Sequence, residues 1–215
     1  MAGVDGKLSG VQPTMSAVSS IPSLIRQAGE AAMTEGLEIL STTLRTDFLQ
    51  GPYPTEIERR SGRFRASFKR GDKDNIFRVK SEGTKIVGTL GSQDVRAHIL
   101  DQGGTIRPTR SQFLAIRTDF TLTGRGVVRE KYRGPLRGLP NTFVQRTRSG
   151  KLGVFEKFGK RIELIAVLVK SVFIRGRHFM DKGVSKATPA IVEHFNVRFQ
   201  AVFTRLNDTL RKLGR

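Results

Sequence analysis

The sequence contains no cysteine, which excludes disulfide bonds and thiolate metal ligands and fits a reducing compartment. It also has no long hydrophobic run. The longest apolar stretch, residues 164–169, is far too short to span a bilayer, so we expect no membrane partner. Residues 1–20 lack the basic start and apolar core of a secretory signal. These absences point away from the secreted and membrane-bound classes of protein.

Acidic residues are scarce relative to basic ones. The chain has 19 Asp and Glu against 38 Lys and Arg, which gives a net charge of +19 and an isoelectric point near 11.3. A charge excess of this size favours contact with a polyanion or with an acidic protein surface.

The chain length of 215 residues suits one domain. We expect a flexible N-terminal arm over residues 1–19 and a single domain over residues 20–215.

Recognisable catalytic constellations are missing too. His98 and Asp101, and likewise His178 and Asp181, have the spacing to face one ion, but no further ligand accompanies either pair. The glycine-lysine stretch 153–161 is one residue too long for a phosphate-binding loop and has no Ser or Thr after its lysine. A Ser–His–acid triad built from distant positions stays open, because sequence spacing does not test it. We therefore predict a protein that is not an enzyme and that holds no cofactor or metal.

Residues 92–108 form the central motif around which we expect the rest of the chain to be arranged. This motif is predicted to be a short helix that ends at two consecutive glycines. Ser92 is expected to cap this helix, and Val95 and Ile99 lie four residues apart, on one face. Three residues are expected to set the turn that follows: Gly103, Gly104 and Pro108. The glycines tolerate the left-handed conformation that ends a helix, and the proline keeps the residue before it extended.

Apolar residues at helical spacing predict a long helix near each end of the chain. The first is expected to start at Ser20, with Pro22 in its opening turn, and to end at the glycine and prolines of 51–54. The second is expected over residues 179–210, where Pro189 could kink or restart it.

Strand signals occupy the region between these helices. Alternating apolar and polar residues around short glycine-containing loops predict β-hairpins over 76–90 and 143–157. Apolar runs predict strands at 113–116 and over 161–174, the latter with a part that is buried on both faces. A short capped helix is expected over 61–68, with Phe64 and Phe68 facing inward. The predicted fold class is α+β, an antiparallel-dominated sheet flanked by an N-terminal and a C-terminal helix.

An extended basic loop, residues 118–142, interrupts the predicted strands. The stretch 107–151 carries eleven Lys or Arg and two acidic residues, a net charge of +9 that is nearly half of the excess of the whole chain. Seven basic residues are candidates for contact with DNA or an acidic partner: Arg107, Arg110, Arg125, Arg129, Lys131, Arg133 and Arg137. With one aromatic residue between Phe120 and Phe143, base stacking is disfavoured, whereas sequence-independent phosphate contact or docking on an acidic protein rim is favoured. A solvated flexible loop is the alternative interpretation.

Four motifs occur in an order that resembles a known family. They are SGRFRASF at 61–68, GSQDVRAHILDQGGTIRP at 91–108, FLAI at 113–116 and SVFIRGRHFM at 171–180. In this order they resemble the tail-completion or minor-tail-protein Z-like family of long-tailed bacteriophages, also called virion morphogenesis proteins. The resemblance covers about residues 61–180. The chain departs from the family pattern at Arg175, where a proline is usual.

The resemblance implies a structural protein of the virion neck, which is made in the host cytoplasm and joins the tail to the head connector. Family members assemble as a ring, commonly of six copies, around the DNA channel. Their expected partners are the neighbouring connector or head-closure protein and the tail-terminator or tail-tube protein, with phage DNA in the lumen. The basic loop would then face either DNA or an acidic ring. The alternative function is that of a sequence-independent nucleic-acid-binding protein.

Overall fold

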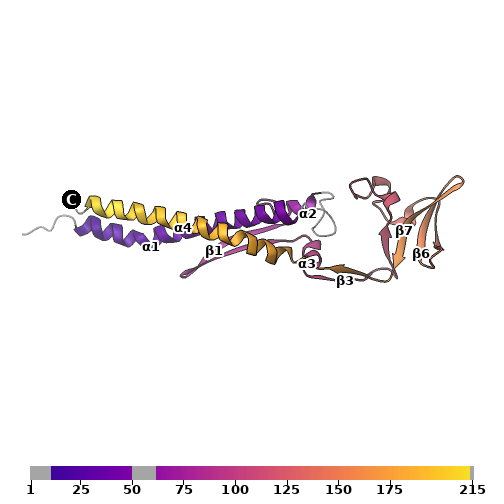
Figure 1. Ribbon diagram of the computed structural model, residues 1–215, viewed down its shortest axis with the longest axis horizontal. Helices are drawn as coiled ribbons and strands as arrows, with labels where there is room; N and C mark the ends of the chain where they lie inside the picture. Colours follow the sequence, from indigo (N-terminus) through magenta and orange to yellow (C-terminus); the bar gives the residue numbers. More distant parts are fainter. Residues whose placement is uncertain (1–10, 50–61, 214–215) are drawn as a thin grey trace, which may run out of the picture. The chain divides into compact units, whose positions relative to one another are not determined.

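The protein has an α+β fold, as predicted, in which long helices accompany antiparallel sheets (Figure 1). The computed structural model describes residues 11–49 and 62–213. One domain was expected over residues 20–215, and the contacts divide the chain into two compact units. The helical unit comprises residues up to Phe48, Arg65–Asp94 and the chain from Phe179 onward, and the sheet unit comprises Leu49–Phe64 and Val95–His178.

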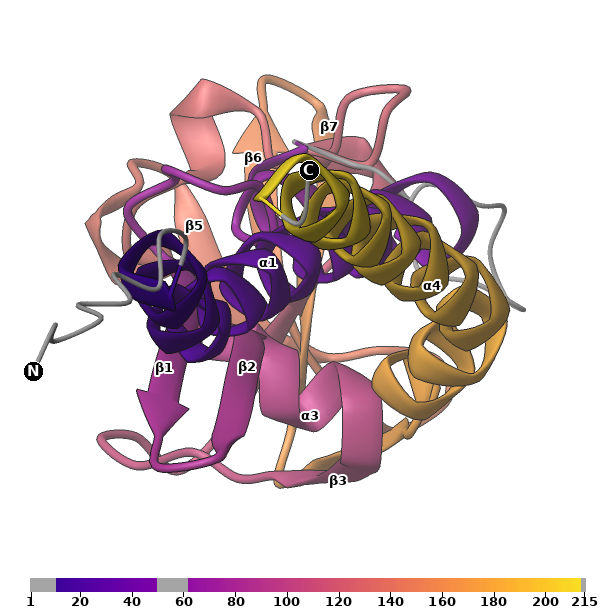
Figure 2. The same ribbon diagram turned by 90° about the vertical axis from the view of Figure 1, so that its left-hand side faces the viewer.

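Two antiparallel helices, α1 (Val11–Thr43) and α4 (Phe179–Leu213), form the backbone of the helical unit (Figures 1 and 2). Small residues allow them to approach closely. A Cβ atom on Gly36 would lie 3.1 Å from Ile191 Cγ2 of α4, and one on Gly183 would lie 3.1 Å from Leu44 Cγ. These two glycines make room for apolar side chains of the facing segment.

The boundaries of these helices differ from the prediction. Helix α1 begins at Val11, inside the segment expected to be a flexible arm, and passes through Pro22 without a break. It continues into a π-helical segment at Leu44–Phe48, and the predicted stop at 51–54 lies outside the described residues. Pro189 also lies inside the continuous helix α4. Because a proline removes only one backbone hydrogen bond, packing along the helix pair can maintain both helices past it.

A β-hairpin of strands β1 (Asn75–Glu82) and β2 (Lys85–Ser92) packs against α1 (Figure 2). The predicted hairpin at 76–90 is confirmed. A Cβ atom on Gly88 would lie 2.9 Å from Met33 Cγ, so the absence of a side chain on this strand position lets α1 lie close to the sheet. The short helix expected over 61–68 is confirmed in part, as α2 (Arg63–Ala66), and residue 61, where its cap was expected, lies outside the described residues. Phe64 of α2 and Phe68 after it are both buried, and the Phe68 ring meets Phe179 edge-on at 5.8 Å.

Charged side chains join α1 to α4 at one point. Glu35 of α1 is hydrogen-bonded to His194 and forms a hydrogen-bonded ion pair with Arg198 of α4. The hydrogen bond from Arg198 is the main reason that the pKa of Glu35 lies below its ordinary value of 4.5. The ionised carboxylate is therefore favoured in the folded helix pair.

We predict that replacing Glu35 with glutamine destabilises the helical unit at neutral pH and changes its pH dependence. A carboxyl group with a lowered pKa contributes stability that is complete above pH 4.5 and is lost as the pH falls through its folded-state value. The variant should thus be about 0.5–1 kcal/mol less stable than wild type near pH 7, and the difference should shrink below about pH 4. Urea denaturation across pH measures both quantities. Glu193→Gln, an exposed carboxylate on α4, is the control, and a pH-independent difference for Glu35→Gln would refute the linkage.

The sheet unit is built on a four-stranded antiparallel sheet in the order β4-β7-β6-β5 (Figure 1). The strands are β4 (Leu114–Arg117), β7 (Arg161–Val169), β6 (Leu152–Phe158) and β5 (Thr142–Arg146). The second predicted hairpin is confirmed as β5 and β6. The predicted segment 161–174 divides in two, because β8 (Val172–Arg175) pairs with β3 (Gly103–Ile106) in a separate ribbon. Adjacent residues Ile165 and Ala166 are both fully buried, so this part of β7 is covered on both faces as expected.

The double-glycine turn has the predicted backbone conformation. Helix α3 (Arg96–Gln102) ends at Gly103, whose φ is 78°, and Gly104 follows with a φ of 144°. A Cβ atom on Gly103 would lie 2.9 Å from the Ile174 carbonyl oxygen and 3.0 Å from Gly176 Cα. The turn therefore needs glycine both for its conformation and for close approach to the strand β8. Pro108 follows two residues after the end of β3.

The predicted cap of α3 is wrong. The residue at the cap position is Val95, and no side chain caps the helix. Ser92 instead accepts a hydrogen bond from the Asp94 backbone N–H at 3.0 Å and shares a hydroxyl hydrogen bond with Ser67 at 2.7 Å. Val95 is 92% exposed, so it shares no buried face with Ile99. The hydroxyl of Ser92 closes a local turn and binds a neighbouring segment rather than the helix.

Candidate interaction surface

The basic loop, residues 118–142, is folded onto the four-stranded sheet. It contains three single turns of 3-10 helix, η2 (Asp119–Thr121), η3 (Glu130–Tyr132) and η4 (Leu136–Gly138). Thr118 fixes its start, since its backbone N–H donates to Ile165 O at 3.2 Å and its hydroxyl donates to Leu164 O at 2.6 Å. The interpretation as a flexible solvated loop is therefore not supported.

An apolar cluster holds the loop in place. Tyr132 of η3 is 4% exposed, and its ring meets the Phe120 ring at 6.3 Å. The buried members of the cluster are Tyr132, Val154, Ile165 and Ala166, and the partly buried ones are Phe120, Val128, Leu136, Leu139 and Leu168. Since most of the partly buried residues come from the loop, its apolar side chains cover the sheet while its arginines remain outside.

A buried carboxylate also links the loop to the sheet through hydrogen bonds. Glu156 of β6 is 3% exposed. It accepts hydrogen bonds from Lys131 Nζ at 2.5 Å and from Tyr132 Oη at 2.9 Å. The bond to Glu156 raises the pKa of Lys131, and burial is the main cause that raises the pKa of Tyr132. Both groups are thus protonated donors at neutral pH.

The candidate contact residues fall into different environments. Lys131 is committed to Glu156, and Arg129 donates to Leu122 O at 2.9 Å, so both help to hold the loop. Arg125, Arg133 and Arg137 are exposed and have no partner among the residues that the structure describes. Arg107 and Arg110 are exposed as well, but they lie between β3 and β4, outside the loop. The loop therefore presents three guanidinium groups that have no partner within the described residues, and Arg107 and Arg110 add two exposed arginines outside the loop.

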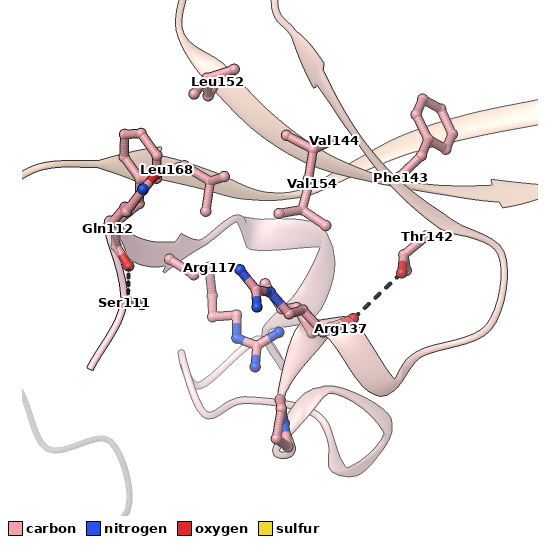
Figure 3. Close-up of a pocket in the computed structure, with 14 residues that line it drawn as sticks. Ser111, Gln112, Arg117, Arg137, Thr142, Phe143, Val144, Leu152, Val154 and Leu168 are labelled. Atoms are coloured by element: carbon pink, nitrogen blue, oxygen red, sulfur yellow. Dashed lines mark hydrogen bonds between the residues drawn. The ribbon is translucent and has the colours of Figure 1, made fainter. Parts of the chain in front are cut away.

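A groove of about 750 Å³ lies on the sheet beside η4 (Figure 3). All four strands contribute to it, and so do the segments that precede β4 and β5. Its lining residues are Ser111, Gln112, Phe113, Ala115, Arg117, Pro135, Leu136, Arg137, Thr142, Phe143, Val144, Leu152, Val154 and Leu168. Of the predicted contact residues, Arg137 alone lines this groove.

Sequence reasoning missed Arg117 as a site residue. It lies at the end of β4, where its Nη2 donates to Gly134 O at 2.8 Å. Its Nη1 is buried and has no hydrogen-bond partner within the described part of the chain. Desolvation by burial lowers the pKa of Arg117. The sequence offered one signal for this site residue, a basic residue at the end of a short apolar strand. It does not show that the loop would lie over that residue.

Neither a metal-binding cluster nor a membrane-spanning helix occurs in the described ranges 11–49 and 62–213. No group of three or more His, Asp or Glu residues in them is placed to hold a metal ion. No helix in them is long and apolar enough to cross a membrane.

The chain was also compared with known proteins. It matches no model of a protein family, no curated protein and no solved structure.

Proposed function

We propose that this protein is a structural component of a bacteriophage neck that joins the tail to the head connector as a ring around the DNA channel. The proposal rests on the motif order described above and on one structural observation, the exposure of apolar residues on both units. Assembly proteins retain such surface for contact with neighbouring subunits, whereas monomers usually keep it small.

The exposed apolar residues lie on elements suited to packing against another chain. In the sheet unit, Phe173 of the β3-β8 ribbon is 73% exposed and Val144 of β5 is 60% exposed. In the helical unit, Val197 and Phe203 of α4 are 58% and 56% exposed. Strands β4 and β5 are also the edges of their sheet. Open edges and exposed apolar side chains both favour association with other subunits.

Charge supports a place beside a polyanion or an acidic neighbour. Arg125, Arg133 and Arg137 project from a loop that is fixed by Tyr132 and Glu156. Because the loop is already ordered, little backbone conformational entropy would be lost when these side chains bind. Six copies in a ring would repeat the three positive charges around the channel.

Native mass spectrometry of the chain alone and with its neck partners tests the proposal. We expect a closed oligomer, or one that forms once the neighbouring ring protein is added. A chain that stays monomeric and never enters particles would contradict the proposal.

The free arginines favour a second candidate, a sequence-independent nucleic-acid-binding protein. That function predicts binding to free duplex DNA, with an affinity that falls by roughly 0.9 log units per phosphate contact for each tenfold rise in salt concentration.

We predict that replacing Arg125, Arg133 and Arg137 together with glutamine leaves stability within about 0.5 kcal/mol of wild type, because all three are exposed and unpaired. Particle completion or DNA retention should nevertheless fall. Thermal denaturation and infectivity measure the two effects. A control that removes three charges from α4 (Arg205→Gln, Arg211→Gln and Lys212→Gln) should retain more infectivity. Wild-type infectivity of the loop variant would show that these charges are dispensable.

A further inference from the structure

The groove on the sheet unit combines an apolar floor with positive charge. Val154 and Leu168 line it from the two central strands, and Val144 adds an exposed apolar side chain from the edge strand β5. None of the lining residues is acidic. The groove thus has no internal counter-charge for the arginines that line it.

Two arginine side chains line this groove. They are Arg117, from the end of β4, and Arg137, from η4 (Figure 3). Arg117 Nη1 is buried without a partner in the described chain, and Arg137 also has none there. An unsatisfied buried donor is unfavourable. A bound anion that reaches the Arg117 guanidinium would lower this cost and would also give Arg137 a partner.

The apolar floor decides which kind of anion suits the groove. A phosphate of the DNA backbone carries no apolar side chain to cover Val154, Leu168 and Val144. A carboxylate on a peptide can lie next to an apolar side chain of the same segment, so one ligand can satisfy the charges and the floor together. The arrangement therefore favours an acidic protein segment over nucleic acid.

We propose that this groove binds an extended, acidic and apolar segment of a neighbouring protein. The segment places an apolar side chain on Val154 and Leu168 and a carboxylate on Arg117 and Arg137. This inference rests on the proposed function in one respect, because it assigns the segment to a neighbouring protein of the neck. For Arg137 it favours the acidic protein ring over DNA as the partner, and it leaves the partner of Arg125 and Arg133 open.

The direct test uses a short capped peptide of alternating leucine and glutamate, labelled for fluorescence anisotropy, and the full-length chain. We expect saturable binding, with NMR methyl shifts at Val144, Val154 and Leu168. Peptides in which lysine replaces glutamate, or serine replaces leucine, should bind at least about tenfold more weakly, because each lacks one of the two features.

Matched charge reversals locate the binding site. Arg137→Glu and Arg125→Glu change the net charge equally, and both side chains are exposed, but only Arg137 lines the groove. Arg137→Glu should weaken peptide binding by about tenfold or more, and Arg125→Glu by less than about twofold. Val144→Ser should weaken it by a few-fold through the lost apolar contact.

Three results would overturn this inference. The first is equal loss in the two charge reversals, which would indicate general attraction between opposite charges. The second is a serine–glutamate peptide that binds as well as the leucine–glutamate peptide. The third is a short DNA duplex whose binding depends on Arg137 and Val144 while the peptide does not bind, which would assign the groove to nucleic acid. If any of these occurs while native mass spectrometry still shows assembly with neck proteins, the proposed function stands and only the groove assignment fails.

Discussion

Replacing Gly103 with alanine is expected to destabilise the sheet unit by about 3 kcal/mol or more. The new Cβ atom would meet the Ile174 carbonyl oxygen and the Gly176 backbone, and backbone atoms cannot move aside as a flexible side chain can. The residue also has a φ of 78° and a ψ of −176°, a combination that essentially only glycine adopts. Urea denaturation measures the loss, and hydrogen exchange should show reduced protection along β3 and β8.

Gly150 offers a matched control for this prediction. It has the same φ of 78°, but nothing lies within 4 Å of the Cβ position. Gly150→Ala should therefore cost about 1–2 kcal/mol, the backbone penalty alone. Equal losses in the two variants would show that close approach to Gly176 is unimportant and that the β3-β8 ribbon does not depend on this turn.

Tyr132→Ala should destabilise the sheet unit by about 3–5 kcal/mol, because it removes a buried aromatic side chain from the cluster that fixes the basic loop. Tyr132→Phe should cost about 1.5–3 kcal/mol, since it keeps the ring and loses only the hydrogen bond to the buried carboxylate of Glu156. In the alanine variant, amides of residues 118–142 should exchange rapidly. Denaturation and hydrogen exchange of both variants separate packing from hydrogen bonding.

The two tyrosine variants also test whether an ordered loop matters for binding. If it does, Tyr132→Ala should lower the affinity for the leucine–glutamate peptide as well as the stability of the fold. Tyr132→Phe should leave the affinity close to that of wild type. Slow exchange of the loop amides in Tyr132→Ala would contradict the role of this side chain as the anchor. In that case the loop would depend mainly on its backbone hydrogen bonds from Thr118.

Local signals were sufficient to predict much of the fold. The two hairpins follow from alternating residues around short glycine turns, and both have the expected pairing. The stop after α3 follows from Gly103 and Gly104, whose backbone conformation no other residue adopts easily. These predictions succeed because the determining interactions lie within a few residues along the chain.

The failures involve contacts between segments far apart in sequence. The start of α1 could not be located at Val11, because a proline at position 22 normally signals a beginning and α1 is stabilised by packing against α4. Glu156 looks like a solvent-facing strand residue until the loop brings Lys131 and Tyr132 over it, 25 and 24 residues away. Arg117 Nη2 donates to Gly134 O of the same loop and its Nη1 is buried, so the sequence did not reveal this part of the candidate site.

Contacts between segments far apart in sequence also explain why the predicted contact residues lie in different environments. They were chosen for their charge and for their position in a loop without periodicity. In the structure, Lys131 and Arg129 bind groups within the sheet unit, and Arg107 and Arg110 precede β4. Arg125, Arg133 and Arg137 are the exposed residues without a described partner that the loop itself contributes.

The most direct test of the central claim is an electron-microscopy map of the neck of intact virions that carry this protein. Our account predicts density for the chain in a closed ring between the head connector and the tail, with an acidic segment of a neighbouring subunit in the groove beside Arg117 and Arg137. A neck from which the chain is absent, in particles that are complete and infectious, would contradict the account.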